Sequence, residues 1–229
     1  MTNKEQTLIR IPNGYDQCQY AFFPGLTLCA FSPEQVVLAY ETILQQFDDS
    51  AIFISQNDAE TIKKYWSDMG KPTVITANSS DALMFREAFP GMHVVSLFEQ
   101  FAKWNIFGSC VHDGYNLIEG EALSNKALKD LLETMGATIK EGIRDDKLPL
   151  LTCDIETRNK LLSEGKDAYY ALDLFFENDP EEDAEHDHEN HQQPALRSPD
   201  ECRAKLCDTS VQSENISDLI ETLNTLFFA

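Results

Sequence analysis

A cysteine, a histidine and an aspartate lie close together in the stretch GSCVHDGY (108–115), and these residue types can form a nucleophilic site. The imidazole of His112 can take the proton of Cys110, and the carboxylate of Asp113 can orient the ring. However, side chains two or three residues apart in a loop rarely point at one another, and catalytic triads usually assemble from distant segments. We therefore interpret this stretch as a turn with one buried cysteine. Catalysis is the alternative, and we predict no catalytic residues.

A second group of possible ligands lies near the C-terminus and consists of His188, His191, Cys202 and Cys207. Imidazole and thiolate are zinc ligands, but the paired ligands of structural zinc sites usually lie two to four residues apart, and this spacing fits poorly. The surrounding carboxylates suit harder ions, yet the chain lacks the DxDxDG pattern of a calcium loop. We predict no metal site and no cofactor, with at most loose binding of divalent ions.

Polar loops follow three predicted strands: SQND (55–58), TANSSD (76–81) and SLFE (96–99). Ligands of parallel α/β sheets bind at such loops, and a phosphate site there needs glycines that leave backbone N–H groups bare. None of the three loops contains a glycine, and GxGxxG and GxxxxGK[ST] are absent from the chain. We interpret the polar residues as helix caps rather than ligand contacts: Asn57, Asn78, Ser79 and Ser80.

Short apolar runs that alternate with helical patterns must position these loops. The runs are AIFI (51–54), TVITA (73–77) and MHVVSL (92–97), and two extended pieces precede them, with turns at Asn13-Gly14 and Pro24-Gly25. A helix is predicted over 33–47, opened by a capping box of Ser32 and Gln35 with Pro33 at the first helical position. This rhythm predicts an α/β fold with a small parallel-sheet core of βα units, three-layered and half-Rossmann-like.

After Gly120 the apolar spacing becomes helical. One stripe runs from Leu123 to Met135, and a further helical region is expected over 154–176, with a break at Gly165. We therefore predict these units: an α/β core with N-terminal strands (1–120), a helical extension packed on it (121–176), an acidic disordered linker (177–212) and a C-terminal docking helix (213–229).

The net charge of −21 is extreme for a chain of 229 residues. Such a protein should repel nucleic acid and anionic lipid, whereas a basic protein partner suits it. No apolar run is long enough to span a bilayer and the N-terminus lacks the apolar region of a secretory signal, so we expect a cytoplasmic protein without membrane insertion. The six scattered cysteines are expected to be mostly buried thiols.

The tail combines dense negative charge with an amphipathic end. Eight carboxylates and three histidines fall within residues 177–191, which are too polar to offset the entropy of ordering. The final helix either fills a groove on its own core or binds a groove of another protein, because either target lies within reach of the linker. Its candidate partner-binding residues are Ile216, Leu219, Ile220, Leu223, Leu226 and Phe227.

These features favour a non-enzymatic interaction protein, an adaptor or accessory subunit of a larger bacterial assembly that forms hetero-oligomers. The βα run over 51–104 and the tail over 177–229 give the chain a charge and layout that resemble accessory subunits of bacterial type IVB secretion coupling complexes. The resemblance implies a protein partner and assigns no functional residues. Two alternatives remain: a ligand- or nucleotide-responsive α/β domain or enzyme that uses the loops after the strands, and an acidic inhibitor of a nucleic-acid-binding protein.

Overall fold

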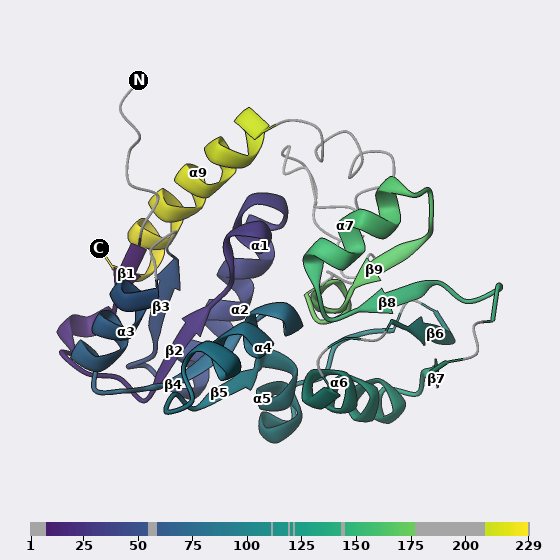
Figure 1. Ribbon diagram of the computed structural model, residues 1–229, viewed down its shortest axis with the longest axis horizontal. Helices are drawn as coiled ribbons and strands as arrows, with labels where there is room; N and C mark the ends of the chain where they lie inside the picture. The colour runs from purple at the N-terminus through teal and green to yellow at the C-terminus, as the bar shows by residue number, and fades with distance from the viewer. Residues whose placement is uncertain are drawn as a thin grey trace, which may run out of the picture.

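The computed structural model of the protein describes residues 8–54, 59–110, 112–118, 120, 122–142, 145–176 and 209–228, and the backbone alone for 59–61 and 209–213. These residues form two β-sheets flanked by helices (Figure 1). The α/β class predicted from the sequence is therefore confirmed. The predicted linker lies almost entirely outside the described residues.

The first sheet takes its strands from the N-terminal half of the chain. In spatial order they are β1 (Leu8–Arg10), β3 (Ala51–Ile54), β2 (Tyr20–Phe23), β4 (Thr73–Thr76) and β5 (Val94–Ser96). β1 runs antiparallel to β3, and the other pairs are parallel, with Phe22 opposite both Ile52 and Ile75. Every residue of β3 is buried, as is typical of a parallel strand covered on both faces.

Helices cover both faces of this sheet. They are α1 (Leu26–Phe31), α2 (Pro33–Gln46), α3 (Ala59–Asp68), α4 (Ser79–Ala88) and α5 (Leu97–Trp104). Successive strand residues point to opposite faces, so Phe23 packs with Phe85 of α4 on one side. On the other side Phe22 packs with Tyr40 of α2. The predicted three-layer arrangement follows from this alternation.

The second sheet is parallel throughout. Its strands lie in the order β7 (Thr138–Lys140), β6 (Gly114–Leu117), β8 (Leu150–Thr152) and β9 (Ala168–Tyr170), and its helices are α6 (Ala122–Thr134) and α7 (Ile155–Ser163). Leu151 belongs to the same core cluster as Leu128 of α6, whereas Leu150 packs with Leu161 of α7. The larger cluster also contains Phe22 and other residues of the first sheet, so the two sheets share one core.

The two sheets have the same strand order. If β1 is set aside, the first reads β3-β2-β4-β5 and the second β7-β6-β8-β9, so the leading strand of each set lies between the second and the third. A helix follows the third strand in both, namely α4 after β4 and α7 after β8. The chain therefore builds a similar parallel unit twice. We call the elements from β1 to α5 the first half and those from β6 to η2 the second half.

The region after Gly120 differs from the expected run of helices. The second sheet begins at Gly114 and continues to Tyr170, across the position where the sequence predicted a boundary. The helix expected over 154–176 ends at Ser163; β9 and the short 3₁₀ helix η2 (Ala171–Leu174) follow it. Aromatic residues fit a buried strand well, and pairing with β8 outweighs the helical spacing of this segment.

The helix expected over 33–47 is confirmed within one residue, but its capping box is not. Ser32 occupies the N-cap position and Pro33 the first helical position, yet the side chain of Ser32 makes no capping hydrogen bond. The Gln35 amide donates instead to the carboxylate of Asp173 in η2. Gln35 therefore contacts the second half of the molecule instead of completing a capping box with Ser32.

The C-terminal helix α9 (Thr209–Phe227) folds back against α1 and α2 (Figure 1). Leu219 and Leu223 are buried there, Asn215 Nδ2 donates to the Ala30 carbonyl at 2.8 Å, and the Phe227 ring lies 5.2 Å from that of Tyr40. The helix thus fills a groove of its own core, one of the two expected arrangements. Neither α9 nor any other helix within the described ranges is long and apolar enough to cross a bilayer.

The described cysteines are thiols that form no disulfide with one another. Cys18, Cys29 and Cys153 are buried and Cys110 is partly buried, which confirms the prediction of mostly buried thiols for this part of the chain. Burial raises the pKa of the Cys18 thiol to about 11, so this group stays protonated at neutral pH.

Two leucines of α9 that differ in exposure test whether the helix is docked. Leu223 is fully buried and Leu226 is 59% exposed. Leu223→Ala should lower the free energy of unfolding by about 3 kcal/mol because it leaves a cavity under the helix. Leu226→Ala should change it by less than about 0.5 kcal/mol. Urea denaturation measures both, and equally small effects would show that α9 is not docked on the core.

Candidate functional site

The parallel strands of the two sheets point their carboxyl ends toward each other, and the loops after β4 and β8 meet there. We call this contact the seam. Its residues are Pro24, Gly25, Ala77, Asn78, Ser79, Ser80 and Asp81 from the first half and Cys153, Asp154, Ile155, Glu156 and Tyr170 from the second half. The predicted loop 76–81 is part of it, whereas loop 55–58 lies outside the described residues.

The two helices that begin at the seam cap each other. Asn78 occupies the N-cap position of α4, but its side chain makes no capping bond to that helix. Its Oδ1 instead accepts from Ile155 N, the first amide of α7, at 3.3 Å. Asp154, the N-cap of α7, accepts from Thr157 N in its own helix at 3.0 Å and from Ser80 N in α4 at 3.2 Å.

A backbone bond completes this exchange, since Ser79 N donates to the Cys153 carbonyl at 3.0 Å. The first amides of a helix have no partner within it, so each must find an acceptor elsewhere. Here Ser79, Ser80 and Ile155 find theirs across the seam. Asn78 is a capping residue, as predicted, but the helix that its side chain caps is α7 of the second half.

The amide of Asn78 also binds the turn after β2. Its Nδ2 donates to the Pro24 carbonyl at 3.1 Å and to Asp81 Oδ2 at 3.0 Å, and the residue is buried. One side chain therefore connects β2, the first turn of α4 and the start of α7. A buried amide with these partners is expensive to replace, because each group left behind would lose its hydrogen bond.

Gly25 allows this close approach. Its φ is +77°, and a Cβ placed there would lie 2.8 Å from Asn78 Nδ2 and would collide with Asp81 Oδ2. Glycine is therefore required twice, once for the backbone conformation and once for the space. The Pro24-Gly25 pair that the sequence marks as a turn is the point at which β2 reaches the seam.

Carboxylates gather around the seam. Asp81 lies in the first turn of α4, and burial raises the pKa of its carboxyl to about 6, with smaller contributions from the negative charges of Asp154 and Glu156; the hydrogen bond from Asn78 opposes the shift. Glu156 Oε1 accepts from Thr27 Oγ1 at 2.8 Å. Negative groups are favoured near helix N-termini, which explains why carboxylates lie where α4 and α7 begin.

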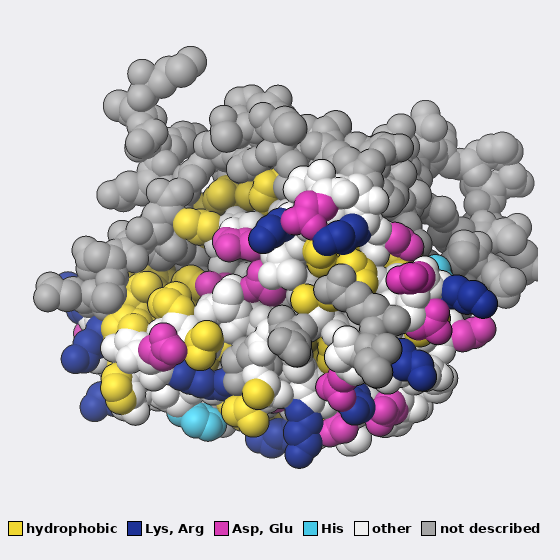
Figure 2. All heavy atoms as spheres, turned by 45° about the vertical axis from the view of Figure 1, so that its right-hand side comes forward, with side chains coloured by type: hydrophobic (Ala, Val, Ile, Leu, Met, Phe, Trp, Pro, Cys, Tyr) yellow, Lys and Arg dark blue, Asp and Glu magenta, His cyan; other side chains and the backbone are white. Residues whose placement is uncertain are grey.

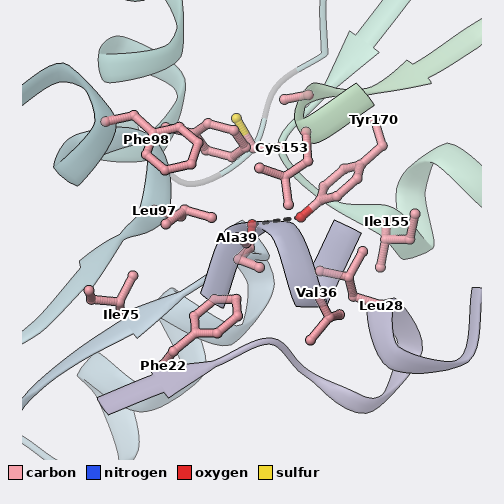
Figure 3. Packing of buried hydrophobic residues seen from close by; sticks show 14 of the residues in the cluster. Phe22, Leu28, Val36, Ala39, Ile75, Leu97, Phe98, Cys153, Ile155 and Tyr170 are labelled. Carbon is pink, nitrogen blue, oxygen red and sulfur yellow. Dashed lines mark hydrogen bonds between the residues drawn. The ribbon is translucent and has the colours of Figure 1, made fainter. Parts of the chain in front are cut away.

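The interior of the seam is filled by side chains (Figure 3). Tyr170 Oη donates to the Ala77 carbonyl at 2.8 Å, and Leu28, Val36 and Ile155 pack near it. Burial raises the pKa of the Tyr170 hydroxyl well above its ordinary value, so it acts here as a hydrogen-bond donor. The edge at which open α/β sheets bind ligands is thus occupied by the protein's own core.

The Cys110–His112 stretch forms a different set of contacts. His112 Nε2 lies 3.1 Å from the Tyr169 hydroxyl, and its backbone N–H donates to the Tyr115 hydroxyl. Burial raises the pKa of the Cys110 thiol, which is opposite to the shift that would activate a nucleophile. The contacts described for this histidine bind it to the second sheet through tyrosines rather than to Cys110.

The predicted zinc candidates His188, His191, Cys202 and Cys207 lie outside the described residues. Within the ranges that the structure describes, no three His, Cys, Asp or Glu side chains are close enough to hold a metal ion.

The predicted partner-binding residues of α9 differ in how far they are buried. Ile216, Leu219 and Leu223 are buried, Ile220 and Phe227 are partly buried against the same core cluster, and Leu226 is exposed. Most of this apolar face therefore holds the helix on its own protein. That these residues bind a partner stays a prediction.

Sequence reasoning marked Gly25 only as a turn residue and Asp81 only as part of the loop 76–81, and it missed the seam residues Asp154 and Glu156. A weak signal was present: β4 ends at Thr76 and is followed by Ala-Asn, β8 ends at Thr152 and is followed by Cys-Asp, and a helix begins after each. Both threonines and both capping residues are buried. This repetition marks the two strand ends that meet.

No protein-family model matches the chain, and neither the curated proteins nor the solved structures give a match.

Asn78→Ala should destabilise the protein by about 3 kcal/mol, because the Pro24 carbonyl and the Ile155 amide both lose their partner in a buried place. Ser80→Ala is the matched control, since the Ser80 side chain is exposed and its change should stay within about 0.5 kcal/mol. Chemical denaturation compares the two. Similar stabilities for both variants would contradict the role assigned to Asn78.

Gly25→Ala should cost more than about 2 kcal/mol, because the new methyl group meets Asp81 and Asn78 at a left-handed backbone position. Gly91→Ala serves as the control, since a Cβ at Gly91 would meet nothing within 4 Å. Thermal unfolding of the two variants provides the measurement. A Gly25→Ala protein as stable as Gly91→Ala would show that the seam is looser than described.

Proposed function

We propose that the protein is a non-enzymatic adaptor or accessory subunit of a larger assembly, and that the outward face of α9 contacts its partner. The observation that carries this proposal is the position of Leu226. This leucine is 59% exposed, whereas the other apolar side chains described between Ile216 and Phe227 pack against the core.

The surroundings of Leu226 form a shallow hollow of about 360 Å³ along α9. The described residues that line it are Asp218, Glu221, Thr222, Thr225 and Leu226. An apolar side chain surrounded by polar groups is typical of the centre of a small protein interface, in which one anchor supplies much of the affinity. Because the opposite face of α9 is held by the core, the helix presents this surface in a fixed orientation.

The charge around the hollow indicates the kind of partner. Asp218 and Glu221 flank the leucine, and the whole chain carries a net charge of −21. A partner segment with basic residues beside an apolar side chain would complement both features, and long-range attraction would raise its association rate.

The distribution of charged side chains on the surface also supports a protein partner. On the face shown in Figure 2, the coloured Lys and Arg side chains are interspersed with Asp and Glu rather than gathered into one basic area. Nucleic-acid-binding proteins usually show a basic stripe or patch. We therefore infer a protein partner in a hetero-oligomer. The similarity in charge and layout to secretion coupling subunits is compatible with such a role.

A quantitative pull-down with the full-length chain tests the proposal. Truncation before α9 is unsuitable because it would expose the core that Leu219 and Leu223 cover. Leu226→Lys keeps the helix in place and puts a positive charge at the centre of the hollow. It should reduce recovery of specific partners by about tenfold or more, as expected when an apolar anchor worth at least 1.4 kcal/mol is lost.

Leu83→Lys is the matched control, since Leu83 is an exposed leucine on α4, 49% exposed, and lies on another part of the protein. It should recover the same partners as the unchanged chain. Loss of partners with Leu83→Lys but not with Leu226→Lys would assign the interface to α4. Full recovery with both variants would rule out the outward face of α9 as the contact.

A further inference from the structure

Asp81 is a seam residue whose ionised form is disfavoured, because its carboxyl group is buried and lies near other carboxylates. It belongs to the first half but faces α7 of the second half, where Asp154 and Glu156 carry the same charge. Its Oδ2 is bound by Asn78 Nδ2, and Gly25 packs against it so closely that no side chain fits between them. The carboxyl group is therefore confined between the two halves.

Groups from several elements surround Asp81. Across the seam these are the carboxylates of Asp154 and Glu156 at the start of α7 and the hydroxyl of Tyr170 at the end of β9. On its own half they are the Asn78 amide, which favours the ionised form, and the thiol of Cys29 in α1. The start of α4 also favours a negative charge, but burial and the two carboxylates outweigh it.

We propose that the seam is a proton-dependent joint, in which a proton on Asp81 tightens the contact between the two halves and its loss loosens that contact. Neutral Asp81 removes one charge from a set of three facing carboxylates. Ionised Asp81 must be held against Asp154 and Glu156 with little water to screen it. The inference does not depend on the function proposed for α9, which lies on a different surface.

The raised pKa of the Asp81 carboxyl sets the direction of the pH effect. The carboxyl pKa is about 6 in the closed seam against an ordinary value of 3.8, so the closed seam binds the proton more tightly than the open one. This contribution to stability is fully present below about pH 4 and is lost as the pH rises through about 6. Above pH 7 the seam should therefore open more often than at pH 5.

Amide hydrogen exchange measured by NMR on the full chain tests the joint directly. The informative amides are those that donate across the seam, Ser79, Ser80 and Ile155. After correction for intrinsic exchange rates, their protection should fall by up to about tenfold between pH 5 and pH 7.5, because the closed-seam pKa of about 6 lies one unit above the lower pH.

Asp81→Asn keeps an acceptor for Asn78 and removes the charge, so its seam amides should show little of this fall. Asp130→Asn removes a charge from an exposed position of α6 and should behave like the unchanged chain. An equal fall in Asp81→Asn, or no fall in the unchanged chain, would overturn the proposal.

A carboxyl ¹³C titration of the unchanged chain gives an independent result that does not depend on how the variants fold. The Asp81 carboxyl should titrate near pH 6, and a midpoint near pH 4 would also overturn the joint.

Discussion

The exchange of helix caps between α4 and α7 is the interaction on which the rest of the structure depends. A helix that begins at the end of a buried strand must find acceptors for its first amides in a place that water does not reach. Here the acceptors for Ser79, Ser80 and Ile155 belong to the opposite half. Directional hydrogen bonds therefore fix how the two sheets face each other, and the shared apolar core alone would not do so.

This geometry has an electrostatic consequence. Two helix N-termini meet at the seam, and each attracts negative side chains. The same closeness brings Asp81, Asp154 and Glu156 near one another, so the charges that suit the single helices repel across the contact. The seam is thus stabilised by hydrogen bonds between the halves and destabilised by repulsion between their carboxylates. It also occupies the edge where α/β sheets usually hold ligands.

Much of the first sheet could be predicted from the sequence, and the second could not, for physical reasons. The run AIFI (51–54) is buried on both sides, so its composition marks it as a strand. In contrast, β7 is only three residues long and largely exposed, and β9 lies within a segment whose apolar spacing also fits a helix. Only the pairing with β6 and β8 settles their conformation.

The capping residues show the same limit at the level of single side chains. Local sequence indicates that Asn78 and Ser32 stand at helix starts, and both do. It cannot indicate that Asn78 caps a helix that begins at residue 155, or that Gln35 turns away from Ser32 to reach Asp173. Such contacts depend on which strand ends meet, and this is decided by the packing of the whole chain.

The repeated strand order gives the contact between the halves a further meaning. Two similar parallel units meet through corresponding loops, those after β4 and β8, and each loop completes the other. Self-complementary contacts of this kind are typical of two-fold symmetric dimers, in which one surface serves both partners. This protein contains such an interface within one polypeptide. Its two halves use different capping residues, Asn78 and Asp154, and the covalent connection keeps them paired at any concentration.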